Sequence, residues 1–164
     1  MNFRLAGIDD LDALVRVRLD FFREMFPPRP PEDQDALADT LRFYCRQHLG
    51  LDFWAILAED SDRPAGAAFL NIYERPANPG APNGRVGELS NVFTYPQYRR
   101  QGLATTMVRQ LIGVAESLGI SRMDLSASET GRRSMKSLVS GRIPGIPACT
   151  CGSTRQTTTK FLYK

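Results

Sequence analysis

The stretch from Glu88 to Leu118 constrains the fold more than any other part of the chain. It has the pattern of a buried strand, then a short basic loop, then a long amphipathic helix. This order places unpaired backbone N–H groups, and the positive end of a helix dipole, beside the end of a strand. Such a place binds phosphate groups. The alternative is an ordinary strand-turn-helix unit whose arginines are only solvated.

The loop between this strand and this helix has one glycine and two arginines. Gly102 lets the backbone approach a ligand closely, and Arg99 and Arg100 add positive charge. Apolar residues then recur at helical spacing, as expected for one buried face. They are Leu103, Met107, Leu111, Val114, Ala115 and Leu118. The sequence contains neither a Walker loop nor a dinucleotide-binding fingerprint, so neither of those phosphate sites is expected.

The pattern Arg99-x-x-Gly102-x-Ala104 follows a strand that ends in the residues from Asn91 to Pro96. It resembles the acetyl-CoA loop of the GNAT superfamily of N-acetyltransferases, whose pattern is [Q/R]-x-x-G-x-[G/A]. The resemblance extends through the strand before the loop, the whole helix after it, and the following segment 121–127. The N-terminal segment 4–11 is also similar to the first strand and helix of that family.

The resemblance implies that acetyl-CoA is the co-substrate and that no metal is needed. The residues expected to contact acetyl-CoA are Val92, Phe93, Thr94, Arg99, Arg100, Gln101, Gly102, Leu103, Ala104 and Thr105. In the family, main-chain N–H groups of the loop hold the pyrophosphate. A main-chain N–H of the preceding strand, at about Val92 or Phe93 here, stabilises the developing oxyanion.

Acetyl transfer to an amine also requires the loss of a proton, because a free alkylammonium has a pKa of about 10. Glu88 is the candidate base, since it lies on the same strand shortly before the cofactor segment. The alternative for Glu88 is a strand-end carboxylate without a catalytic role. Asn91 is a polar residue in a strand that is otherwise expected to be buried, so it contacts either the substrate or a structural partner. Direct attack by the amine needs no cysteine or serine nucleophile.

The order of the other segments predicts an α/β fold with a central mixed, mostly antiparallel sheet and helices on both faces. A strand at 3–5 precedes a helix that begins after a cap at Asp9 or Asp10. A proline-rich link at 27–31 leads to a second helix, which starts near Glu32 and ends near His48. Strands follow at 54–59, 64–73 and 85–94, with turn residues between them. The resemblance implies that the first two helices form a wall of the acceptor site.

Composition excludes several other classes of protein. All 18 acidic residues lie at or before Glu129, so the net positive charge belongs to the C-terminal tail. The part of the chain before the tail therefore gives no support for nucleic-acid binding. No apolar run is long enough to span a membrane, and no secretory signal is evident, so a cytoplasmic location is expected. Three cysteines and one histidine give neither a disulfide framework nor a zinc site. A monomer and a homodimer are both open.

The last segment does not follow the family pattern. Segment 129–133 leads toward the family's general-acid tyrosine, but Met135 stands at that position, and methionine cannot donate a proton. Reading the codons from Ser134 one base earlier permits Tyr-Glu-Lys-Pro-Gly-Phe-Arg, an ordinary GNAT ending. The hypothesis is therefore a GNAT domain at 1–133 and a frame-shifted tail at 134–164, with the final strands missing or altered.

The sequence therefore predicts an N-acetyltransferase that moves an acetyl group from acetyl-CoA to a primary amine of a small molecule or peptide. The alternative is a non-catalytic acyl-CoA-binding or interaction module, inactive because the tyrosine is absent. The acceptor cannot be identified from the sequence.

Overall fold

The computed structural model describes residues 1–28, 30–120 and 122–125. In these ranges a single sheet has the strand order β1-β2-β3-β4-β5. The strands are β1 (Asn2–Leu5), β2 (Phe53–Asp60), β3 (Arg63–Glu74), β4 (Arg85–Thr94) and β5 (Arg122–Leu125). Neighbouring strands are antiparallel except for β4 and β5, which are parallel. The predicted mixed, mostly antiparallel sheet is confirmed.

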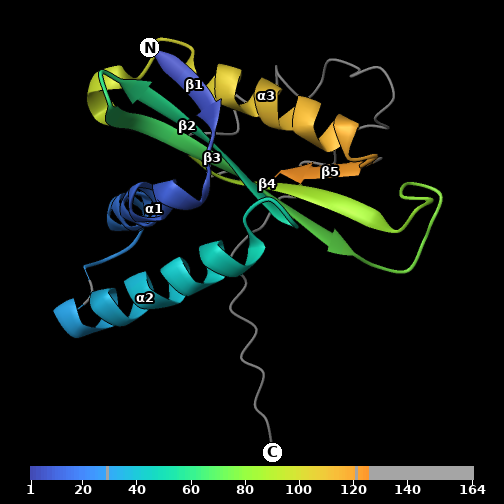
Figure 1. Cartoon of the computed structure of the whole chain (residues 1–164), viewed down its shortest axis with the longest axis horizontal. Helices are drawn as coiled ribbons and strands as arrows, with labels where there is room; N and C mark the ends of the chain where they lie inside the picture. Colours follow the sequence, from blue (N-terminus) through green and yellow to red (C-terminus); the bar gives the residue numbers. More distant parts are fainter. Residues whose placement is uncertain (29, 121, 126–164) are drawn as a thin grey trace, which may run out of the picture.

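The helices cover both faces of this sheet, as predicted. They are α1 (Leu11–Met25), α2 (Pro31–His48) and α3 (Leu103–Ser117), with single 3₁₀ turns η1 (Ile8–Asp10) and η2 (Pro96–Tyr98). Helix α3 lies over one face, whereas α1 and α2 lie on the other (Figure 1). The prolines between α1 and α2 break the helical run, so the two helices form separate rods.

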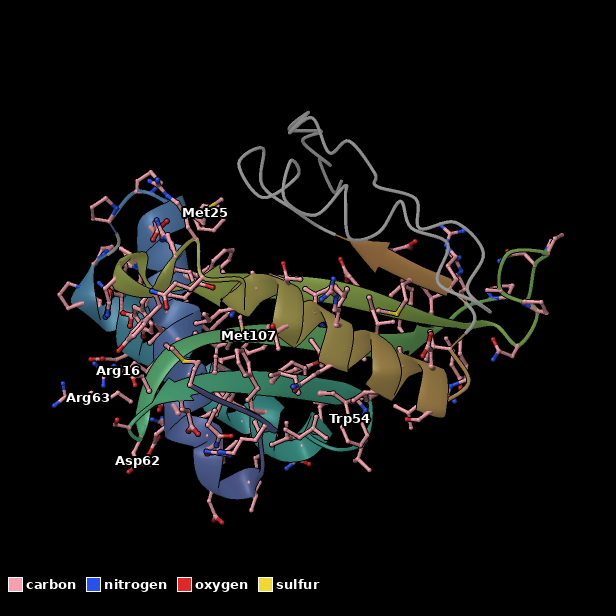
Figure 2. The ribbon with its side chains drawn as sticks, turned by 90° about the horizontal axis from the view of Figure 1, so that it is seen from above. Arg16, Met25, Trp54, Asp62, Arg63 and Met107 are labelled. Carbon is pink, nitrogen blue, oxygen red and sulfur yellow. The ribbon has the colours of Figure 1, made fainter. Side chains whose placement is uncertain are left out.

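Each face of the sheet has its own apolar core. On the α3 side, Met107 and Leu111 are fully buried against the sheet residues Ile56 and Leu70, and Figure 2 labels Met107 beneath the helix. On the α1 side, Leu14 and Val17 pack with sheet residues of the second cluster. The helical spacing of apolar residues in the sequence therefore corresponds to real buried faces.

A β-bulge interrupts β4 and defines where the site lies. Ala67 pairs with Phe93, but Phe69 pairs with Ser90, so one extra residue stands on β4. Asn91 has a φ of 47°, in the left-handed region that favours glycine. A bulge bends its strand and turns successive side chains toward one face. Ser90 and Asn91 both contact groups on the α1 and α2 side as a result.

Two further expectations from the sequence concern the start of α1 and the C-terminal tail. Asp10 occupies the N-cap position of α1, but the predicted side-chain cap is wrong. Its carboxylate instead accepts hydrogen bonds from the Gly7 N–H at 2.7 Å and from Arg4 at 2.7 and 2.8 Å, because the guanidinium is the stronger donor. The boundary at 133, the tail at 134–164 and Met135 lie outside the described residues.

Candidate active site

The start of α3 presents a row of unengaged main-chain N–H groups. Within the described ranges, no N–H of residues 100–105 donates a hydrogen bond, and the first to do so is that of Thr106, to the Gly102 carbonyl at 3.0 Å. Arg100 and Gly102 have positive φ values of 61° and 80°. Successive N–H groups in turns of this kind form concave anion sites. A Cβ placed on Gly102 would have no heavy atom within 4 Å, so the loop faces open space.

The two loop arginines have different surroundings. The Arg99 guanidinium donates to the Glu24 carboxylate at 2.6 Å and to the Thr94 carbonyl at 3.0 Å, which ties the end of α1 to the end of β4. Arg100 is exposed and forms no ion pair in the part of the chain that the structure describes. Gln101 donates back to the Gln97 carbonyl at 3.3 Å. Arg99 therefore has a structural partner, and Arg100 is the arginine available for a ligand.

The end of the strand before the loop carries three of the residues predicted to contact acetyl-CoA: Val92, Phe93 and Thr94. The described pairs between β4 and β5 join residues 86–89 with residues 122–125. Val92 packs toward the α3 cluster, whereas Phe93 packs toward α1, where its ring centroid lies 6.1 Å from that of Phe21. The Thr94 hydroxyl is buried without a hydrogen-bond partner among the described residues. The predicted cofactor segment therefore contributes side chains to both faces of the sheet.

Glu88, the candidate base, lies on the α2 side of the sheet. It is half-buried and pairs in register with Asn71 of β3 and Asp124 of β5. Residues directly opposite in a sheet share a face. Asn71 accepts a hydrogen bond from the Tyr44 hydroxyl of α2 at 3.1 Å and donates to Ser90 at 3.2 Å. Glu88 therefore shares the face on which α1 and α2 lie.

Asn91, the candidate substrate contact, is only 3% exposed. Its Oδ1 accepts a hydrogen bond from Arg18 Nη1 at 3.1 Å, while its Nδ2 is buried with no partner among the described residues. Arg18 was not predicted from the sequence. One signal could have found it, because Arg18 follows Leu11 and Leu14 by seven and four residues and so interrupts the buried stripe of α1.

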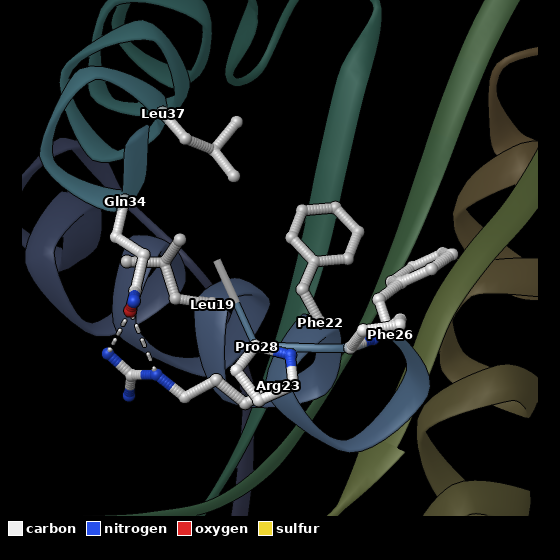
Figure 3. Close-up of a pocket in the computed structure, with 8 residues that line it drawn as sticks. Leu19, Phe22, Arg23, Phe26, Pro28, Gln34 and Leu37 are labelled. Carbon is white, nitrogen blue, oxygen red and sulfur yellow. Dashed lines mark hydrogen bonds between the residues drawn. The ribbon is translucent and has the colours of Figure 1, made fainter. Parts of the chain in front are cut away.

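A cavity of about 490 Å³ lies between α1, the proline-rich link and α2, and we call it the α1–α2 cavity (Figure 3). Its lining is mostly apolar: Leu19, Phe22, Arg23, Phe26, Pro27, Pro28, Gln34 and Leu37. Arg23 and Gln34 are hydrogen-bonded to each other at 3.3 and 3.4 Å on one side of it. The cavity lies between the two helices that, by the resemblance to the GNAT family, are expected to form a wall of the acceptor site.

His48, near which the sequence predicted the end of the second helix, is the last residue of α2. Its Nδ1 lies 2.7 Å from the Asp52 carboxylate, and its ring stacks on Tyr44 at 4.3 Å. In residues 1–28, 30–120 and 122–125 there is no group of three or more His, Cys, Asp or Glu residues placed to hold a metal ion. No described helix is both long and apolar enough to cross a membrane.

Comparison with known families identifies the arrangement. The family model for the acetyltransferase (GNAT) family matches residues 12–137, most of the chain. The chain belongs to the GNAT family of acetyltransferases. It is an acyltransferase by this membership, and the unengaged amides at the start of α3 lie within the matched range.

Solved structures of other GNAT proteins share the fold. A predicted acetyltransferase with acetyl-CoA from Clostridium acetobutylicum is 25% identical over 83% of this chain and 86% of its own, with a TM-score of 0.74. A GCN5-related N-acetyltransferase from Ralstonia eutropha JMP134 is 23% identical over 93% and 95%, with a TM-score of 0.73. AAC(6′)-Iy, in complex with the bisubstrate analogue CoA-S-monomethyl-acetylneamine, is 16% identical over 99% and 96%, with a TM-score of 0.64. No curated protein matches the sequence.

Proposed function

We propose that this GNAT protein transfers an acetyl group from acetyl-CoA to a primary amine by direct attack of the amine. The observation that carries the proposal is the row of N–H groups at residues 100–105, which have no acceptor among the described residues and follow the end of β4. These residues fit a diphosphate, because the loop combines a helix N-terminus with N–H donors and an arginine charge, Arg100, that have no partner in the described part of the chain. Acetyl-CoA supplies an acetyl group that is already activated as a thioester.

The residues of the chain have separate roles in this proposal. The amides from Gln101 to Thr105 hold the pyrophosphate. A main-chain N–H at Val92 or Phe93, next to the bulge, stabilises negative charge on the acetyl oxygen. Glu88, directly or through a water molecule, accepts a proton from the amine, and its position on the α2 face supports a path from the acceptor side.

The binding step is tested by thermal melts of the full chain with and without acetyl-CoA. A ligand that binds only the folded state raises the midpoint, so a rise at saturating acetyl-CoA is expected. The absence of a rise would contradict the proposal for the α3 amides. Release of free thiol with a panel of primary amines then tests for transfer.

The role of Glu88 is tested with Glu88→Gln in the same two assays. General-base catalysis contributes on the order of 10²-fold or more, so kcat should fall by about that factor while the acetyl-CoA shift is unchanged. Glu74→Gln, an exposed carboxylate at the end of β3, is the matched control and should leave kcat as it is. An unchanged kcat in Glu88→Gln would assign proton removal to water alone.

A second function is favoured by one observation, the methionine at position 135 where the family has its general-acid tyrosine. A chain that lacks this acid could bind acyl-CoA without turning it over. Acetyl-CoA would then raise the melting midpoint, but no amine in the panel would release thiol. The same pair of assays therefore distinguishes the enzyme from the binding module.

A further inference from the structure

Arg18 of α1 is a half-buried cation for which the described part of the protein supplies no carboxylate. The Asn91 amide oxygen, at 3.1 Å, is its hydrogen-bond acceptor there, and no described acid forms an ion pair with it. Two other arginines on this side of the sheet do have carboxylate partners. Arg4 is held by Asp10 and Glu59, both at 2.7 Å, and Arg99 is held by Glu24.

An unpaired cation in this position is unfavourable for stability. Burial lowers the pKa of Arg18, because the charged form loses solvation. The titratable group that acts on it is Cys45, and burial raises the pKa of that thiol, so the thiol is neutral near pH 7 and adds no negative charge. Partly desolvated charges are normally paired. Among the described residues, Arg18 therefore lacks an anionic partner.

The geometry of Arg18 suits a carboxylate. Its guanidinium carbon lies 4.4 Å from the centroid of the Phe22 ring, so the plane of the group is supported by an aromatic face. The guanidinium has more in-plane N–H donors than the bond to Asn91 uses. Such a fork binds a carboxylate with two parallel hydrogen bonds.

Arg18 also lies where an acceptor would have to bind. Its partner Asn91 directly precedes the segment at which the acetyl oxygen is proposed to lie, and Asn91 Nδ2 is a buried donor that still lacks a partner in the described ranges. Phe22 connects Arg18 with the α1–α2 cavity, because the same ring also lines that cavity. The Arg18 guanidinium and the α1–α2 cavity therefore both adjoin the Phe22 ring, near β4.

We propose that Arg18 is a specificity-determining residue that selects acceptors carrying a carboxylate close to the primary amine, with an apolar substituent in the α1–α2 cavity. This inference rests on the proposed acetyl transfer, since it names the acceptor for the same site. Amines of this class include apolar α-amino acids.

The test compares leucine with leucinamide, which keeps the amine and the apolar side chain but has no carboxylate. The full chain should prefer leucine in kcat/KM of thiol release, and should bind leucine more tightly in calorimetry at saturating CoA, by on the order of tenfold to a hundredfold. Arg18→Gln should remove this preference and retain the acetyl-CoA melting shift. The binding measurement needs no turnover, so a failure of the proposed catalysis remains distinguishable from a failure of this inference.

Arg16→Gln is the matched control, because Arg16 is an exposed arginine of the same helix. It lines a different hollow with Asp62 and Arg63, and Figure 2 labels these three residues at the same end of the molecule. Arg16→Gln should leave the preference unchanged. Equal affinity of the full chain for leucine and leucinamide, or no binding of leucine at all, would overturn the assignment. A preference for leucine that survives in Arg18→Gln would overturn it as well.

Discussion

The two faces of the sheet are built on different principles. On the α3 face, the side chains form a closed apolar core, and the groups offered to a ligand are main-chain N–H groups at the start of the helix. On the face covered by α1 and α2, the groups near β4 are side chains, namely Arg18, Asn91 and Glu88, next to an apolar cavity. The first face suits the part of a substrate that is constant across a family, and the second suits the part that varies.

This difference explains why a site can persist on one face while specificity changes on the other. Main-chain donors depend on a helix start and one glycine, so most side-chain substitutions leave them in place. The contact between Arg18 and Asn91 joins residues 73 positions apart and is lost by changing either. Substitutions on the α3 side should therefore affect the stability of the protein and its affinity for acetyl-CoA. Substitutions on the α1 side should affect which amine acceptor is preferred.

The largest expected effect is on the α3 core. Met107 is fully buried, so Met107→Ala removes apolar contacts and leaves a cavity. The free energy of unfolding should fall by about 3 kcal/mol and the melting midpoint by roughly 6–12 °C. Acetyl-CoA affinity of the folded protein, measured by calorimetry well below the midpoint, should change little. The exposed Gln110→Ala on the same helix is the control, and a comparable loss there would contradict the explanation by burial.

The next effect concerns the glycine at the start of α3. Gly102 has a φ of 80°, where a side chain is strained by about 1–2 kcal/mol even though nothing crowds the position. A chain that relaxes this strain must rotate the N–H groups beside it. Gly102→Ala should therefore lower the stability by about that amount and weaken acetyl-CoA binding by roughly tenfold.

Gly119 provides a matched control for this substitution. It has a φ of 70°, nothing lies within 4 Å of its Cβ position, and it stands at the opposite end of the same helix. Gly119→Ala should lose similar stability and keep the affinity for acetyl-CoA. Equal weakening of binding by both variants would show that the effect comes from the helix as a whole rather than from the loop amides.

The difference between the faces also separates what the sequence could predict from what it could not. The α3 side is encoded locally: helical spacing predicted the buried face, and one glycine after a strand predicted an anion site, which stays a prediction; its amides are unengaged among the described residues. The sheet was predictable because its neighbouring strands follow mostly in chain order. Arg18 was missed, because its significance depends on Phe22, on the bulge at Asn91 and on the lack of an ion-paired acid among the described residues. The cap at Asp10 failed for a similar reason, since the competing donor Arg4 comes from another element.

The smallest expected effect is a loss of stability when Arg4 is replaced, and Arg18 on the same side of the sheet provides the comparison. Arg4 lies between two largely buried carboxylates, and its guanidinium holds the pKa of Asp10 below the ordinary value of 3.8. A carboxyl group whose pKa is lowered by folding stabilises the protein above its unfolded pKa, and this contribution is lost as the pH falls through the folded value. Urea unfolding of the native sequence should therefore show that the free energy of unfolding falls below about pH 3.8. Part of this fall is the lost contribution of Asp10.

Arg4→Gln should remove about 1 kcal/mol at pH 7, a modest figure because Arg4 is 39% exposed and partly screened by solvent. Since Asp10 then loses its main partner, the difference between the variant and the native sequence should shrink as the pH falls below 3.8. Arg18→Gln should behave differently, because no described carboxylate forms an ion pair with Arg18. The free energy of unfolding of this variant, plotted against pH, should run parallel to that of the native sequence in acid. A pH-dependent difference for Arg18→Gln equal to that of Arg4→Gln would mean that Arg18 has a structural counter-ion, and the contrast between a structural and a selective arginine would fail.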